Sequence, residues 1–84
     1  MKFRKKPVVI EAILHLGDNI EELLDFMGVV ERANAITDTI IIRTLAGDMR
    51  CNKGDWIIKG IKGELYPVRD EIFQLTYEPA YPLL

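Results

Sequence analysis

Mostly apolar residues with a two-residue period occupy residues 5–16, the first patterned stretch of the chain. From residue 8 to residue 16 the even positions are all apolar, while the odd positions carry Glu11 and His15 among apolar residues. One apolar face and one mixed face are typical of a strand that packs on a core. Pro7 suits the first position or the edge of such a strand, where its missing N–H removes no ladder hydrogen bond. We therefore predict a strand over residues 5–16.

A helical period replaces the alternation after residue 17. The apolar residues of the next segment recur at i, i+3, i+4 and i+7, which is one stripe of a helix; they are Ile20, Leu23, Leu24 and Met27. Asp18 with Glu21 resembles a capping box, and Gly28 is a suitable C-terminal stop. We predict a helix between Asp18 and Gly28 whose apolar stripe belongs to the core.

The middle of the chain predicts short strands joined by turns. A run of β-branched residues at 39–45 indicates a strand, and Gly, Asp and Asn residues mark the turns around the strand that follows. Residues 29–36 leave two alternatives open, an edge strand or irregular chain. The remaining expected segments are a turn at 37–38, a turn at 46–48, a strand at 49–51 and a turn at 52–55.

Residues 54–68 predict a β-hairpin that holds the only tryptophan of the chain. If the loop runs from Gly60 to Gly63, an opposite-charge pair and three apolar pairs face each other across the strands. The predicted pairs are Lys59 with Glu64, Ile58 with Leu65, Ile57 with Tyr66 and Trp56 with Pro67.

The end of the chain predicts one helical turn within residues 68–73 and then a last strand. Phe73, Leu75 and Tyr77 alternate with polar residues up to Pro79. An apolar, proline-bearing tail at 80–84 could fray or dock on another subunit. We expect one α+β domain at residues 1–79, a curled and mainly antiparallel sheet of five to six short strands packed on one α-helix, followed by this tail.

The charge of the chain narrows the function classes. A net charge of −2 is not typical of a protein that coats nucleic acid, which usually carries a basic surplus. A local surplus at Lys2, Arg4, Lys5 and Lys6 could touch phosphate or could be a solvated chain end. The apolar runs are short and interrupted, so we expect neither a signal peptide nor a membrane span, and a cytoplasmic location.

The chain offers little for catalysis. It has one histidine, His15, and one cysteine, Cys51, and no local spacing supplies either with a partner. We expect a partly exposed His15, a half-buried Cys51, no disulfide, no metal, no cofactor and no enzymatic activity. An enzyme would require these two side chains and a carboxylate to converge in one cleft.

Aromatic residues are the best candidates for a binding surface. Trp56, Tyr66, Phe73 and Tyr77 could form a platform for a base or a peptide, although so small a domain also needs them as core mass. The candidate contacts for a ligand or partner are Trp56, Tyr66, Lys5, Lys6 and Tyr81.

Several blocks, in this order and spacing, resemble an uncharacterised family of small phage and prophage proteins. They are the Lys-Lys-Pro-Val-Val-Ile-Glu-Ala block at 5–12, Gly-Asp-Met at 47–49, Gly-Asp-Trp-Ile-Ile-Lys-Gly at 54–60, Gly-Glu-Leu-Tyr-Pro at 63–67, Ile-Phe at 72–73 and Thr-Tyr-Glu at 76–78. The chain departs from the family at Trp56, where tyrosine is usual, at His15, where tryptophan is expected, and at Asp70, where proline is expected. The resemblance implies a phage or prophage origin and the cytoplasm of a host cell, and it transfers no catalytic residues.

Two functions therefore stand side by side. The first is a non-enzymatic binding or assembly module, a homo-oligomer whose partner is a host or phage protein or a small ligand. The alternative is a nucleic-acid or nucleotide binder that uses the basic N-terminus together with the aromatic hairpin as a stacking surface.

Overall fold

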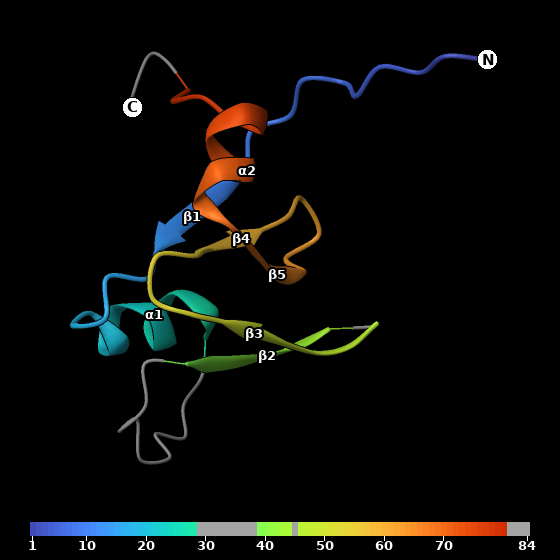
Figure 1. The fold of residues 1–84 in the computed structure, drawn as a ribbon. Helices are drawn as coiled ribbons and strands as arrows, with labels where there is room; N and C mark the ends of the chain where they lie inside the picture. The colour runs from blue at the N-terminus through green and yellow to red at the C-terminus, as the bar shows by residue number, and fades with distance from the viewer. Residues whose placement is uncertain (29–38, 45, 81–84) are drawn as a thin grey trace.

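Five strands and two helices follow one another in the computed structural model, which describes residues 1–28, 39–44 and 46–80. Their order is β1 (Glu11–Leu14), α1 (Ile20–Met27), β2 (Ile40–Thr44), β3 (Gly47–Cys51), β4 (Trp56–Lys59), β5 (Leu65–Val68) and α2 (Asp70–Thr76). Figure 1 shows the mixture of helices and strands that the sequence predicted as α+β. The predicted single sheet and single helix are wrong, because the described residues hold two sheets and two helices.

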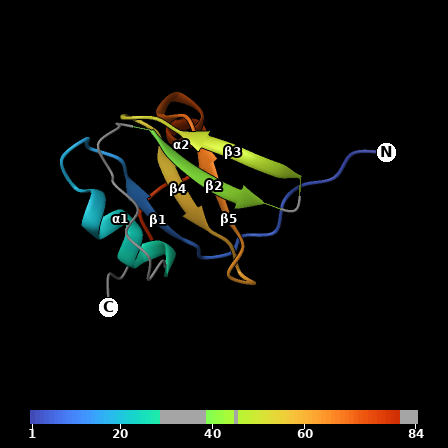
Figure 2. The same ribbon diagram turned by 90° about the horizontal axis from the view of Figure 1, so that it is seen from below.

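The two sheets are antiparallel and lie in successive layers. The order of the larger sheet is β1-β4-β5, and β2 pairs with β3 in the smaller one. The β2–β3 ribbon lies across the β4–β5 side of the larger sheet, with α1 beside it, while α2 lies on the opposite face (Figures 1 and 2). The three-stranded sheet is therefore covered on both faces, which explains why its central strand β4 contains two fully buried isoleucines, Ile57 and Ile58.

One face of the larger sheet meets the main core. Ile57 and Ile13 lie opposite each other on this face and pack with Leu23 of α1 and Ile42 of β2. Ile58, Ala12 and Tyr66 are opposite one another on the other face, toward α2. The apolar parity of the first strand thus faces α2, and the mixed parity supplies Ile13 to the core. The predicted strand at 5–16 shortens to Glu11–Leu14 because β4 offers only four residues to pair with.

The hairpin of β4 and β5 forms, but its register differs from the prediction by one residue. Lys59 is opposite Leu65 instead of Glu64, and Trp56 is opposite Val68. The Gly60 N–H donates to the Glu64 carbonyl at 2.8 Å, so the loop has three residues and ends at Gly63, whose φ is +81°. A three-residue loop that ends in a left-handed glycine is a preferred hairpin geometry. The predicted Lys59–Glu64 pair is therefore wrong.

The charged partners of that predicted pair have other contacts. The Lys59 ammonium lies 4.5 Å from the centre of the Phe26 ring of α1, a cation–π contact. The Glu64 carboxylate accepts from the Lys62 N–H at 3.1 Å and lies against Gly60, where any side chain would collide with it. Both charges are thus placed by neighbours outside the strand pair.

The predicted last strand is a helix. In a strand, Phe73, Leu75 and Tyr77 would all lie on the same face. In a helix, Phe73 and Tyr77 share one face because they are four residues apart, and Leu75 lies on another. Phe73 and Tyr77 are half-buried in the structure, while Leu75 is 86% exposed. The helical period prevails because β4 presents Trp56 as a stacking partner for Phe73.

The first helix begins and ends almost as predicted. Gly28 has a φ of +76° and closes α1 with its N–H on the carbonyls of Leu24 and Asp25. Asn19 stands at the N-cap position in place of Asp18, and its side chain does not cap the helix. The strands predicted at 39–45 and 49–51 and the turn at 52–55 are confirmed for the described residues. The predictions for 29–38 and for residues 81–84 of the tail, Tyr81 included, lie outside the described residues.

Candidate functional site

An aromatic cluster covers the face of the larger sheet that carries α2. The rings of Trp56 and Phe73 are stacked with centroids 3.9 Å apart, and Phe73 and Tyr77 follow at 5.1 Å. The Tyr77 hydroxyl lies 3.4 Å from the hydroxyl of Tyr66 on β5. Strand β4, strand β5 and helix α2 therefore bring together the four rings that the sequence suggested as a platform.

A hydrogen bond holds α2 against the tryptophan. The Trp56 indole N–H donates to Asp70 Oδ1 at 2.8 Å, and the Gln74 amide donates to the same oxygen at 3.1 Å. These two donors lower the pKa of Asp70 below its ordinary value of 3.8, the indole having the larger effect. The first turn of α2 is thus tied to β4 at neutral pH, where Asp70 is ionised.

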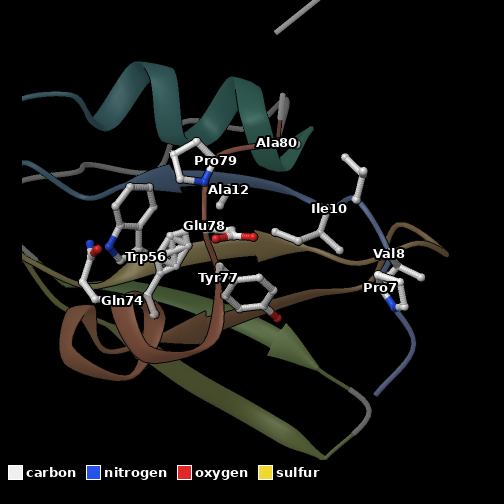
Figure 3. A pocket seen from close by; sticks show the side chains of 12 residues that line it. Pro7, Val8, Ile10, Ala12, Trp56, Gln74, Tyr77, Glu78, Pro79 and Ala80 are labelled. Atoms are coloured by element: carbon white, nitrogen blue, oxygen red, sulfur yellow. The ribbon is translucent and has the colours of Figure 1, made fainter. Parts of the chain in front are cut away.

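An apolar cleft of about 640 Å³ opens beside this cluster. We call it the aromatic cleft, and Figure 3 shows its lining from three parts of the chain: the segment leading into β1, the β4 tryptophan, and α2 with the residues after it. Its volume lies within the range of about 300–1,000 Å³ that is common for ligand sites. The lining residues are Pro7, Val8, Val9, Ile10, Ala12, Trp56, Phe73, Gln74, Tyr77, Glu78, Pro79 and Ala80.

The charged groups at the cleft have opposite signs. Figure 3 shows the Glu78 side chain in the middle of the cleft, between Trp56 on one side and Ile10 on the other. The Lys5 ammonium lies 5.4 Å from the centre of the Tyr77 ring. An apolar, aromatic-lined hollow with a carboxylate in it favours a ligand that has an apolar body and a cationic group.

The predicted contact residues are distributed unevenly around this cleft. Trp56 lines it as a half-buried ring, and Lys5 lies at Tyr77. Lys6 is exposed beside the lining residue Pro7. Tyr66 lines a second hollow of about 520 Å³ between β5 and the end of the smaller sheet. Burial raises the pKa of the Tyr66 hydroxyl to about 12, with smaller contributions from Tyr77 and Glu64. Tyr81 lies outside the described residues.

His15 and Cys51 are fully buried, in contrast to the half-exposed positions that the sequence predicted. Neither side chain lines the aromatic cleft. The His15 Nδ1 accepts from the Gly17 N–H at 3.1 Å, and its backbone pairs with Gly54 and Asp55. Burial, and then the charge of Asp55, raises the pKa of the Cys51 thiol to about 12. A thiol with this pKa keeps its proton at neutral pH, so it is a poor nucleophile.

No group of three or more His, Cys, Asp and Glu side chains within residues 1–28, 39–44 and 46–80 could hold a metal ion. In the same part of the chain no helix has the length and the apolar character to cross a membrane.

The sequence missed the N-terminal and C-terminal walls of the cleft. Val8, Ile10 and Ala12 carried a signal, since their shared parity marked one apolar face. Glu78 and Pro79 carried none, because their place beside Trp56 depends on α2 turning the chain back over the sheet. Comparisons of the chain with protein-family models, with curated proteins and with solved structures found no match.

Proposed function

We propose that this protein is a non-enzymatic binding or assembly module whose site is the aromatic cleft. The observation that carries the proposal is the combination of Trp56, Tyr77 and Glu78 in one hollow of about 640 Å³. Stacked aromatic rings offer contact area with little conformational entropy to lose, and a carboxylate among them selects a cation. The expected ligand is an extended peptide segment that alternates aromatic and cationic side chains.

The setting of this module is part of the same proposal. The blocks quoted above resemble phage and prophage proteins, which supports an accessory role in the cytoplasm of an infected or lysogenic host. The partner is then a phage or host protein segment, or a segment of the same chain.

Fluorescence of Trp56, the only tryptophan, tests the site directly. A blocked pentapeptide that alternates phenylalanine and lysine should change the emission saturably, because it places an aromatic ring on the cluster and an ammonium near Glu78. A matched peptide with glutamate in place of lysine should bind at least about tenfold more weakly. Equal effects of both peptides, or no effect of either, would show that the cleft is not such a site.

The alternative, a nucleic-acid or nucleotide binder, is supported by Lys5, which lies beside the aromatic cluster at Tyr77. It predicts quenching of Trp56 by an oligonucleotide, with an affinity that falls steeply as salt rises. The carboxylates of Glu78 and Asp70 beside the same rings oppose a phosphate chain, which is why we place this function second. Oligonucleotide binding without peptide binding would reverse that order.

A further inference from the structure

The first six residues form an exposed segment that we call the N-terminal arm. Every residue of the arm is exposed, and the side chain of Phe3 is 88% exposed. Figure 1 shows this part of the chain leading away from both sheets. Burial of the Phe3 ring against another surface would be favourable, because it removes apolar area from water.

The arm has the chemistry that the aromatic cleft favours. Its sequence Met-Lys-Phe-Arg-Lys-Lys alternates apolar and cationic residues over its first four positions. The Phe3 ring suits the stacked rings of Trp56 and Phe73, and the cations suit Glu78.

The charge of the molecule is divided between the arm and the remainder. The arm holds four of the eleven basic residues, and no acidic residue precedes Glu11. Residues 11–84 hold the other seven basic residues and all thirteen acidic ones, which gives a net charge of −6. Two copies therefore attract each other when the arm of each approaches the body of the other.

The position of the arm makes a reciprocal exchange possible. The arm ends at Lys6, and the next residues, Pro7 to Ile10, are themselves a wall of the cleft. An arm that leaves one cleft at this rim can enter the cleft of a second copy facing it. A two-fold axis between the copies then repeats the same contact, so that each protomer both donates an arm and receives one.

We propose that the aromatic cleft binds the N-terminal arm of a second copy of this chain, so that two protomers assemble by exchanging arms. The partner copy contributes Phe3, Lys2 and Arg4 to a site that is incomplete without them. This proposal rests on the proposed function of the cleft and names its ligand.

Sedimentation velocity over a range of concentrations measures the assembly. The wild-type chain should dimerise, and Phe3→Ala should weaken the dimer by at least about tenfold, because Phe3 is the main apolar anchor. The matched control is Leu75→Ala, since Leu75 is 86% exposed on α2 and does not line the cleft. Glu78→Lys should have an effect similar to that of Phe3→Ala, and Glu71→Lys, an exposed position on α2 outside the cleft, should have little.

A charge exchange distinguishes reciprocal binding from any other dimer. The arm variant K2E/R4E and the cleft variant E78K should each be largely monomeric when alone. Their equimolar mixture should form a heterodimer, because the reversed arm then meets the reversed cleft and the unaltered arm meets the unaltered cleft. Failure of the mixture to associate, when both variants are folded by circular dichroism, would overturn the exchange.

Two further outcomes would also reject the second copy as the occupant. If the wild-type chain is a monomer whose Trp56 emission changes when residues 2–6 are removed, the arm lies in its own cleft. If a dimer persists unchanged without residues 2–6, another surface makes it. In either case the peptide titration on the chain without residues 2–6 still reports on the cleft, so the proposed function stands or falls separately.

Discussion

Asn19 shows how much a single side chain contributes to the connection between β1 and α1. It is only 8% exposed. Its Oδ1 accepts from the Leu16 N–H and its Nδ2 donates to the Leu14 carbonyl, both at 2.9 Å. A buried backbone group that loses its partner carries the full penalty of desolvation, so this amide replaces the backbone pairing that the strand end lacks.

Replacing this amide should therefore destabilise the fold. We expect Asn19→Ala to lower the free energy of unfolding by about 2 kcal/mol, because two part-buried backbone groups lose their side-chain partner. Asn52→Ala is the matched control, since Asn52 is exposed in a turn, and it should lower the free energy by less than about 1 kcal/mol. Urea denaturation followed by circular dichroism measures both. Equal losses would mean that the two backbone bonds of Asn19 contribute nothing.

At the scale of the element, α2 is held by its contacts with β4 and not by its own propensity. The helix has seven residues, a length that is only marginally stable in isolation. Trp56 supplies both the ring that stacks on Phe73 and the N–H that Asp70 accepts. The ionisation of Asp70 should therefore control how stably the first turn of α2 packs on the sheet.

Acidification tests this coupling. The folded-state pKa of Asp70 is lowered, so its stabilising contribution is present above the ordinary value of 3.8 and is lost as the pH falls through the folded pKa. We expect the Trp56 emission to change with a midpoint below pH 3.8 in the wild-type chain. The change should be absent in Asp70→Asn, which does not titrate, and should remain in the matched control Glu71→Gln. Identical curves for all three proteins would contradict the role of Asp70.

For the whole molecule, one core joins the two sheets. Leu23 of α1, Ile42 of β2 and Ile57 of β4 are fully buried in a single cluster. Neither sheet could bury its apolar face alone, because a two-stranded ribbon and a three-stranded sheet are each marginal in water. The sheets should therefore unfold together.

Two probes can follow the two sheets separately. Trp56 fluorescence reports on the larger sheet, and the reactivity of the buried Cys51 thiol toward an alkylating reagent reports on the smaller one. Ile42→Ala should shift both transitions together and lower the free energy of unfolding by about 3 kcal/mol. Ile41→Ala is the matched control on the same strand, because Ile41 is 49% exposed, and its effect should stay below about 1 kcal/mol. Transitions that separate would show two independently folded sheets.

Features that depend only on neighbours along the chain could be predicted from the amino-acid sequence. The stripe of α1 with its glycine stop, the β-branched strand β2 and the turn at 52–55 follow from local period and backbone preference. Features that depend on partners distant in the chain follow only from the packing of the folded protein. The hairpin register shifted by one residue because the loop has three residues and ends at Gly63, and the last segment became a helix because Trp56 lies beneath Phe73. The aromatic cleft belongs to the second kind, since residues 7–12 and 73–80 meet only across the sheet, where burial of apolar surface outweighs local preference.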